Sequence, residues 1–199
     1  MSDQRMLLSL FQEAVGEQCE FALAAASSIN PALQQLGAKS GNGVDWDAHK
    51  QAQHQLWFMM HALLNAAANL SKHLWPNEGR RTREAFPDRG EQLRRSLDVP
   101  DDSPLANRTL RNHFEHLDER LEHWWLTDEQ HNIARRTIGP LEGSIEGLSA
   151  EQKFEWFDPQ KLILAFRGDL FEIQPLVNAI VTLKEKTDAV NAHPWWQTD

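Results

Sequence analysis

Cysteine, tyrosine and long apolar runs are what this sequence has least of. Its 199 residues include a single cysteine, Cys19, and no tyrosine, so no internal disulfide can form and a reducing compartment is expected. No stretch approaches the roughly 18 consecutive apolar residues of a membrane-spanning helix, and the N-terminus lacks a basic start followed by a continuous apolar run. We therefore expect a cytoplasmic protein without a signal peptide or a membrane partner.

Motifs for bound cofactors and activated nucleophiles are also missing. The chain has no Gly-x-Ser-x-Gly elbow, and its glycines form neither a phosphate-binding loop nor a dinucleotide fingerprint. Cys19 lies among Phe21, Ala22 and Leu23 and is expected to be a small buried side chain. We predict no cofactor, and we interpret Arg167-Gly168-Asp169 as a tight turn.

Positive charge is scarce overall but concentrated in one segment. The formal net charge of −9 excludes a general nucleic-acid coat or a membrane-surface binder. The local exceptions are Arg80, Arg81, Arg83, Arg89, Arg94 and Arg95. These arginines are interrupted by only three acidic residues, so they form either a solvated connection or a patch for an anionic partner.

Apolar spacing predicts a mainly helical chain. The expected helices span 3–28, 45–73, 90–97, 104–126 and 175–190. Asn30-Pro31 is expected to end the first helix, Asp45 to cap the second, and Ser103-Pro104 to begin the helix at 104.

Between about 133 and 174 the pattern changes to turn signals and short strands. The expected strands are 153–157, 161–166 and 170–173, separated by turns at 158–160 and 167–169. The predicted fold is an antiparallel bundle of four to five helices with a small antiparallel β meander inserted before the C-terminal helix. We expect this β appendage and the helix at 175–190 to belong to a single domain, 1–199.

The helix expected at 104–126 carries the most informative segment. Its apolar stripe comprises Leu110, Phe114, Leu117, Leu121 and one of Trp124 and Trp125. At about 100° per residue, Arg111, Asn112 and His116 then point away from the bundle core. Such residues can form a site only at a surface cleft or a subunit interface.

Arg111-Asn112-His113-Phe114-Glu115-His116 resembles the signature of the HEPN superfamily, in which an arginine and a polar residue precede a histidine on a bundle helix. The resemblance implies a homodimeric helical bundle that acts as a metal-independent endoribonuclease, of the kind found in toxin–antitoxin and defence systems. In that family the motif helices of two subunits pair to form one site. An RNA substrate and a neutralising partner protein are therefore expected.

The resemblance assigns catalytic roles to Arg111, Asn112 and His116. The RNA 2′-hydroxyl would attack the adjacent phosphate and leave a 2′,3′-cyclic phosphate and a 5′-hydroxyl. His116 would transfer protons, and Arg111 would hold the phosphate. Asn112 would orient the phosphate or His116 by hydrogen bonding. The candidate substrate-binding residues are Arg108, His113, Arg80 and Arg81. His113 borders the apolar stripe, so a packing or capping role is also expected of it.

Two other functions stay open. A non-catalytic interaction or scaffold module would explain the eight tryptophans, because tryptophan often anchors interfaces, and Trp195-Trp196 would then either fold back or contact a partner. A metal-binding bundle would explain the histidines at 49–73 and 113–123. However, the 104–126 segment contains neither Glu-x-x-His nor His-x-x-x-His, so we predict no metal ligands.

Overall fold

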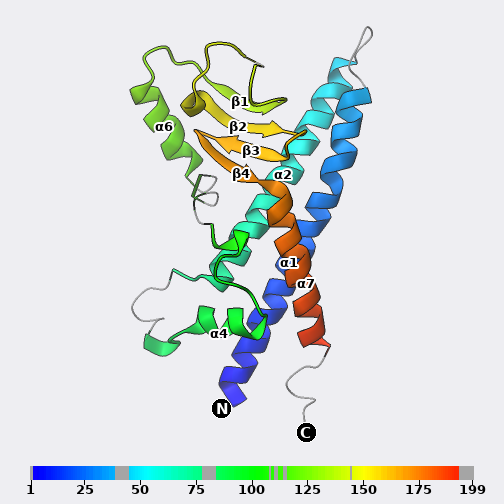
Figure 1. Cartoon of the computed structure of the whole chain (residues 1–199), viewed down its shortest axis with the longest axis vertical. Coiled ribbons are helices and arrows are strands. Elements are labelled where there is room, and N and C mark those ends of the chain that lie inside the picture. The colour runs from blue at the N-terminus through cyan, green and yellow to red at the C-terminus, as the bar shows by residue number, and fades with distance from the viewer. Residues whose placement is uncertain are drawn as a thin grey trace. The chain divides into compact units, whose positions relative to one another are not determined.

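The computed structural model describes residues 2–38, 45–77, 84–107, 109, 112–113, 116–143 and 145–192. In these residues the protein is mainly helical, with a four-stranded sheet inserted before the C-terminal helix, which confirms the predicted fold class (Figure 1). The chain forms two compact units: Met1–Arg108 with Leu176–Asp199, called here the helical unit, and Thr109–Pro175, the sheet unit. No described helix is both long and apolar enough to cross a membrane.

Two long helices, α1 (Ser2–Ala38) and α2 (Trp46–Leu74), lie side by side in the helical unit (Figure 1). The predicted end of the first helix at Asn30-Pro31 is wrong, because α1 continues through Pro31. Pro31 is exposed, whereas Ile29, Ala32 and Leu36 are buried. Burial of this continuing apolar stripe outweighs the one backbone hydrogen bond that proline removes.

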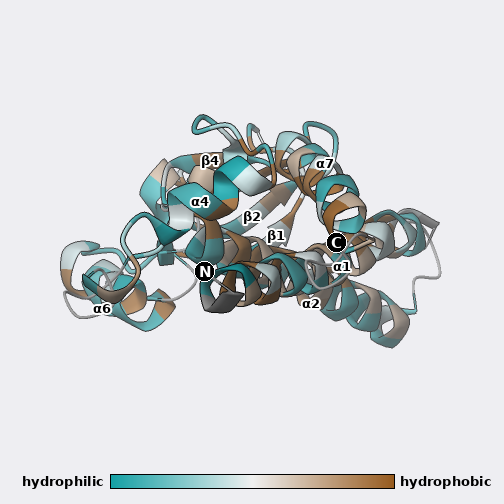
Figure 2. Ribbon diagram, turned by 90° about the horizontal axis from the view of Figure 1, so that it is seen from below, coloured by the Kyte–Doolittle hydropathy of each residue, from teal (hydrophilic) through white to brown (hydrophobic). Residues whose placement is uncertain are grey.

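The start of α2 and the position of α4 (Arg89–Ser96) agree with the sequence predictions. The Asp45 carboxylate accepts hydrogen bonds from the backbone N–H groups of Asp47 and Ala48, each at 3.1 Å, and so caps α2. α4 is mostly hydrophilic (Figure 2), and its Gly90 and Leu93 are buried. The short helix is thus anchored by few residues.

The predicted C-terminal helix is confirmed as α7 (Ile173–Asn191). Leu176, Ile180 and Leu183 are buried, which gives this helix one apolar face. Polar contacts join α7 to the rest of the helical unit. Lys184 Nζ lies 3.2 Å from Glu20 Oε1 of α1, and Lys186 Nζ lies 2.9 Å from Asp98 Oδ2.

The sheet unit contains β1 (Ala134–Ile138), β2 (Lys153–Asp158), β3 (Ile163–Phe166) and β4 (Asp169–Glu172), in the order β1-β2-β3-β4. β2, β3 and β4 form the predicted antiparallel meander. β1 departs from the prediction, because it pairs with β2 in parallel. Residues 139–152, including the 3₁₀ turn η2 (Ala150–Gln152), carry the chain back to the end of the sheet from which β1 began.

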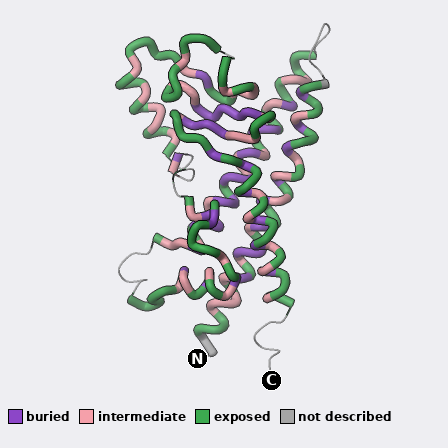
Figure 3. The backbone as a smooth tube through the Cα atoms, in the orientation of Figure 1, coloured by how far each residue is buried: buried purple, intermediate pink, exposed green. Residues whose placement is uncertain are grey.

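Both faces of the central strands are covered, as the purple strands in Figure 3 show. Glu155 has a left-handed φ of 53°, which interrupts the regular alternation of side chains along β2. Phe154 packs on Phe166, with ring centroids 5.2 Å apart, whereas Trp156 clusters with Ala165. Because Ala165 and Phe166 point to opposite faces of β3, these β2 aromatic residues build two different cores.

The prediction of one helix over 104–126 is wrong. The Ser103 hydroxyl does accept the Leu105 N–H at 3.3 Å, as predicted, but it caps only the 3₁₀ turn η1 (Pro104–Ala106). Asn107, with φ −68° and ψ 108°, ends that turn. The α-helix α6 (Leu117–Thr127) begins after His116 and has no buried residue. Thr109, Asn112 and His113 are also helical, but His116, with φ −120° and ψ 38°, interrupts the helix before α6.

Candidate functional site

Three of the predicted site residues lie in the described part of the chain: Asn112, His113 and His116. Arg80, Arg81, Arg108 and Arg111 lie outside the described residues. The site is therefore built from the neighbourhood of the three described motif residues, all of which belong to the sheet unit.

His113 is enclosed by the sheet and has the packing role expected from its position. It is 7% exposed, and its ring stacks on Phe166 at 4.6 Å and meets the edge of Phe171 at 5.9 Å. Its Nε2 lies 2.6 Å from Asp169 Oδ2 in β4. A side chain so enclosed fixes the motif segment to the sheet and offers little surface to a substrate.

Asn112 and His116 precede α6 and lead into a polar face of this helix. The His116 N–H donates to the Asn112 carbonyl at 3.2 Å, and the Arg120 N–H donates to the His116 carbonyl at 3.1 Å. These bonds keep the spacing of an α-helix across the start of α6. His116, Arg120 and His123 therefore lie on one face, at positions i, i+4 and i+7.

A residue from the β3–β4 turn joins this face. Arg167 Nη1 donates to the Arg120 carbonyl at 3.2 Å, and Arg167 Nη2 lies 3.3 Å from His123 Nδ1. Its guanidinium also lies over the Phe154 ring, 5.4 Å from the centroid. We call His116, Arg120, His123 and Arg167 the Arg–His cluster.

The Arg–His cluster contains two guanidiniums near each other, with the carboxylates of Glu119 and Glu151 beside it. Burial lowers the pKa of Arg167, and the nearby Arg120 lowers it further, with Glu151 opposing both. Arg120 Nε is buried without a hydrogen-bond partner among the described residues. Two guanidiniums crowded in this way favour an anion between or beside them.

One carboxylate lies at the edge of the cluster. Glu119 Oε1 is 3.3 Å from His116 Nδ1, and both side chains are substantially exposed. An exposed pair of this kind is weak and is screened by solvent. An anionic ligand can therefore displace Glu119 from His116 at little cost.

The sequence predictions missed Arg120, His123 and Arg167 as site residues. Arg120 and His123 could have been found, because they follow His116 at helical spacing. Arg167 lies in the triplet predicted to be a tight turn, and Arg167 and Gly168 do form that turn, with φ values of 49° and 90°. Only the contacts of Arg167 with Arg120 and His123 in the folded chain show that the turn approaches α6.

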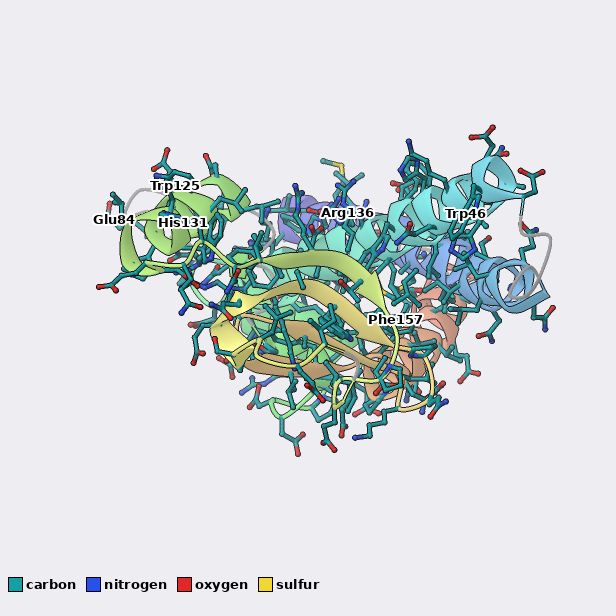
Figure 4. The ribbon with its side chains drawn as sticks, turned by 90° about the horizontal axis from the view of Figure 1, so that it is seen from above. Trp46, Glu84, Trp125, His131, Arg136 and Phe157 are labelled. Atoms are coloured by element: carbon teal, nitrogen blue, oxygen red, sulfur yellow. The ribbon has the colours of Figure 1, made fainter. Side chains whose placement is uncertain are left out.

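A second feature of α6 is an apolar surface away from the Arg–His cluster. Trp125 is 58% exposed and Leu126 is 83% exposed. Trp125 packs against His131, with ring centroids 4.0 Å apart (Figure 4). A shallow hollow of about 550 Å³ is lined by Leu121, Glu122, Trp124, Trp125 and Leu126.

No family model, curated protein or solved structure matches this chain. In the part of the chain that the structure describes, no three His, Cys, Asp or Glu side chains gather where they could hold a metal ion. The chemistry available to this protein is consequently inferred from the side chains of the Arg–His cluster and the motif beside it.

Proposed function

We propose that this protein is a metal-independent endoribonuclease of the HEPN type, and that the Arg–His cluster binds the phosphodiester to be cleaved. The observation that carries the proposal is the approach of Arg167 to Arg120 and His123 beside the motif residue His116. The two guanidiniums supply bidentate donors for a phosphate. The imidazoles are the side chains that exchange protons most readily near neutral pH.

The proposed reaction needs no group beyond RNA and these side chains. The 2′-oxygen forms a bond to the adjacent phosphorus as its proton passes to one imidazole, and the bond from phosphorus to the 5′-oxygen breaks. The departing 5′-oxygen takes a proton from a second imidazole, leaving a 2′,3′-cyclic phosphate and a 5′-hydroxyl. His116 and His123 fill the two proton-transfer roles, and Arg111, Arg120 and Arg167 stabilise the charge that develops on the phosphate oxygens.

The proposal includes a homodimer, in which the motif segments of two copies complete one site, and a neutralising partner protein. Asn112, next to Arg111, orients the phosphate or an imidazole. Arg80, Arg81 and Arg108 are the proposed contacts to neighbouring phosphates. Light scattering of the purified protein tests the dimer, because a strict monomer at concentrations where RNA is cleaved would contradict a shared site.

The decisive experiment is RNA cleavage by purified protein in EDTA, with variants of the motif and of the cluster. His116→Ala, Arg111→Ala and Arg167→Ala are each expected to lower the cleavage rate by roughly 10²- to 10⁴-fold. A 2′-deoxy substitution at the cleaved position should block the reaction, because the nucleophile is then absent. The products should carry cyclic-phosphate ends.

The matched control is Arg95→Ala, because Arg95 is exposed and already paired with Glu91 in α4. This variant should cleave RNA at the wild-type rate. Equal residual cleavage in all samples would mean that a contaminating nuclease is responsible, and the proposal would then be abandoned.

A non-catalytic interaction module is the second candidate, and the exposure of Trp125 and Leu126 favours it. Large exposed apolar side chains on a helix commonly mark a protein contact. This function predicts that Trp125→Ala abolishes binding to a partner, whereas Arg167→Ala has no effect on it. RNA cleavage with the stated dependence on His116 would exclude a purely non-catalytic function.

A further inference from the structure

A cavity in the helical unit lies outside everything proposed for the motif. It has a volume of about 360 Å³ and lies between the segment 97–105 and one face of α7. The α7 residues that line it are Ala179, Thr182, Leu183 and Lys186, which share one face of the helix at spacings of three, one and three. A cavity of this size falls in the range of small-molecule sites.

The walls of the cavity are apolar and firmly held. Leu97, Leu105 and Leu183 lie beneath its floor, with exposed fractions of 1%, 3% and 3%, and the accessible apolar lining comes from Val99, Pro100, Pro104 and Ala179. The segment that faces α7 is braced by its own backbone: the Val99 N–H donates to the Arg94 carbonyl at 2.9 Å, and the Ser103 N–H donates to Pro100 at 3.2 Å. A site that exists before its ligand arrives loses little conformational entropy on binding.

The polar groups that line the cavity carry a net negative charge. Asp98 Oδ2 lies 2.9 Å from Lys186 Nζ, so this carboxylate and this ammonium neutralise each other. The bond to Lys186 also lowers the pKa of Asp98, which keeps the carboxylate ionised. Asp102 is an exposed residue that lines the same cavity and forms no ion pair with any described residue, so its negative charge is available to a ligand.

The neighbouring Asp101, unlike Asp102, has an ion-pair partner. Its carboxylate is 3.1 Å from Arg94 Nε and does not line the cavity. Asp101 and Asp102 are therefore adjacent residues of the same type, of which one is paired outside the cavity and the other is unpaired at its wall. This difference supplies a matched pair for mutation.

We propose that this cavity binds a small organic amine, with an apolar body against Val99, Pro100 and Ala179 and a protonated amino group beside Asp102. The negative lining disfavours carboxylates and phosphates, including RNA. The apolar walls disfavour fully polar cations such as inorganic ions, because only an apolar body gains from burial there. The proposal is independent of the nuclease activity.

The test is a calorimetric titration of the full-length protein with three probes that share a phenyl group. They are 2-phenylethylamine, 2-phenylethanol and phenylacetate. We expect saturable binding of the amine with a Kd of roughly 1 mM or below, at least about tenfold weaker binding of the alcohol, and no binding of phenylacetate.

Variants then assign the two halves of the ligand. Asp102→Asn should remove the preference for the amine over the alcohol, and Asp101→Asn should leave it unchanged. Ala179→Phe and Thr182→Phe should each fill the cavity and abolish binding of both probes. Two such variants are used so that one that fails to fold, as judged by its thermal unfolding, can be replaced by the other.

Three outcomes would overturn the proposal. The first is the absence of saturable amine binding up to about 10 mM, because the expected Kd is at least about tenfold lower than that concentration. The second is equal binding of phenylacetate and the amine. The third is a folded Asp102→Asn or cavity-filling variant that binds the amine as the wild type does.

Discussion

His113 and Asp169 join the motif segment to strand β4 through one short hydrogen bond. His113 is enclosed by Phe166 and Phe171, and Asp169, which is half exposed and lies on the same face of β4 as Phe171, is its hydrogen-bond partner. A buried imidazole needs a hydrogen-bond partner, because an unsatisfied polar group in an apolar site is costly. Asp169 therefore supports the proposed cleavage site by holding His113 in place, without a proposed contact of its own to RNA.

Replacing Asp169 should loosen this attachment. We expect Asp169→Ala to lower the free energy of unfolding by about 1–3 kcal/mol, because His113 would be left buried without its acceptor. Denaturant titration followed by tryptophan fluorescence measures the change. The control is Glu172→Ala on the same strand, which is exposed and should change stability by less than about 0.5 kcal/mol. Equal stability of the two variants would show that the hydrogen bond contributes nothing.

Cys19 should be unreactive in the folded protein. Burial raises the pKa of its thiol to about 12 from the usual 9.0, with Lys184 partly opposing the effect. At pH 8 a thiol with a pKa of about 12 is ionised about a thousandfold less often than one at 9.0. We expect a chromogenic disulfide reagent to label Cys19 only after unfolding in guanidinium. Rapid labelling of the native protein at pH 8 would contradict this burial.

The raised pKa of Cys19 also makes the free energy of unfolding depend on pH. The unfolded thiol loses its proton at lower pH than the buried one, so the unfolded state binds fewer protons above about pH 9. The stability associated with the neutral Cys19 thiol is complete below that pH and declines as the pH rises further. Cys19→Ala should remove this contribution to the pH dependence, and an unchanged alkaline profile in the variant would exclude it.

Individual residues were predicted well where the signal was local. The capping roles of Asp45 and Ser103 and the burial of Cys19 follow from short-range chemistry, and the structure confirms all three. Arg167 could not be assigned to the site from the sequence, because its contacts with Arg120 and His123 cross more than forty positions of the chain. No local pattern encodes a contact at that separation.

At the scale of elements, Gly90 is a position where helix propensity and packing favour different residues. Gly90 lies in the first turn of α4, where alanine would ordinarily stabilise a helix by up to about 1 kcal/mol. A methyl group at Gly90 would, however, lie 2.8 Å from the Leu74 carbonyl oxygen and closer still to the Pro76 ring. We therefore expect Gly90→Ala to destabilise the protein by about 1–3 kcal/mol, because overpacking outweighs propensity.

Gly37, near the end of α1, supplies the opposite case. Among the described residues, no atom outside the neighbouring helix backbone lies within 4 Å of the position a methyl group would take. Gly37→Ala should raise the free energy of unfolding by about 0.4–1 kcal/mol, mainly by restricting the unfolded chain. Thermal unfolding of both variants compares the two effects. A stabilising Gly90→Ala would show that α4 can move away from the end of α2.

Elements were predictable where a buried apolar face specified them. The positions of α2, α4, α7 and the β2–β4 meander follow from periodicity and capping. The end of α1 was misplaced because the local preference of Pro31 was given more weight than burial of Ala32 and Leu36. The helix at 104–126 was overextended because its regular leucine spacing was taken to indicate burial, whereas α6 has no buried residue.

For the whole molecule, the decisive property is a strong negative charge. The net charge of −9 repels nucleic acid at long range, so the proposed binding of RNA through Arg120 and Arg167 has to act against the average field. Composition predicted this conflict but could not predict its resolution. That depends on the β3–β4 turn and α6, which are distant in sequence: Arg167 donates to the Arg120 carbonyl, and the two charges are close enough for Arg120 to lower the pKa of Arg167.

The salt dependence of RNA binding tests this arrangement. Each phosphate neutralised in single-stranded RNA contributes about −0.7 to the slope of log K against log salt concentration. The double variant Arg120→Ala/Arg167→Ala should therefore reduce the magnitude of that slope by about 1.4 and weaken binding at low salt. Arg95→Ala, which removes one charge from a residue paired with Glu91, should leave the slope unchanged.

Fluorescence anisotropy with a labelled oligoribonucleotide, at several salt concentrations and in EDTA, gives both slopes under one set of conditions. Non-cleavable 2′-O-methyl RNA keeps the measurement at equilibrium, because its blocked 2′-oxygen cannot attack the phosphate. If Arg95→Ala lowers log K by half as much as the double variant does, each lost charge has the same effect, and the loss comes from net charge and not from the Arg–His cluster. A slope that changes only in the double variant would identify the sheet unit as the part of the protein that neutralises phosphates, despite the overall negative charge.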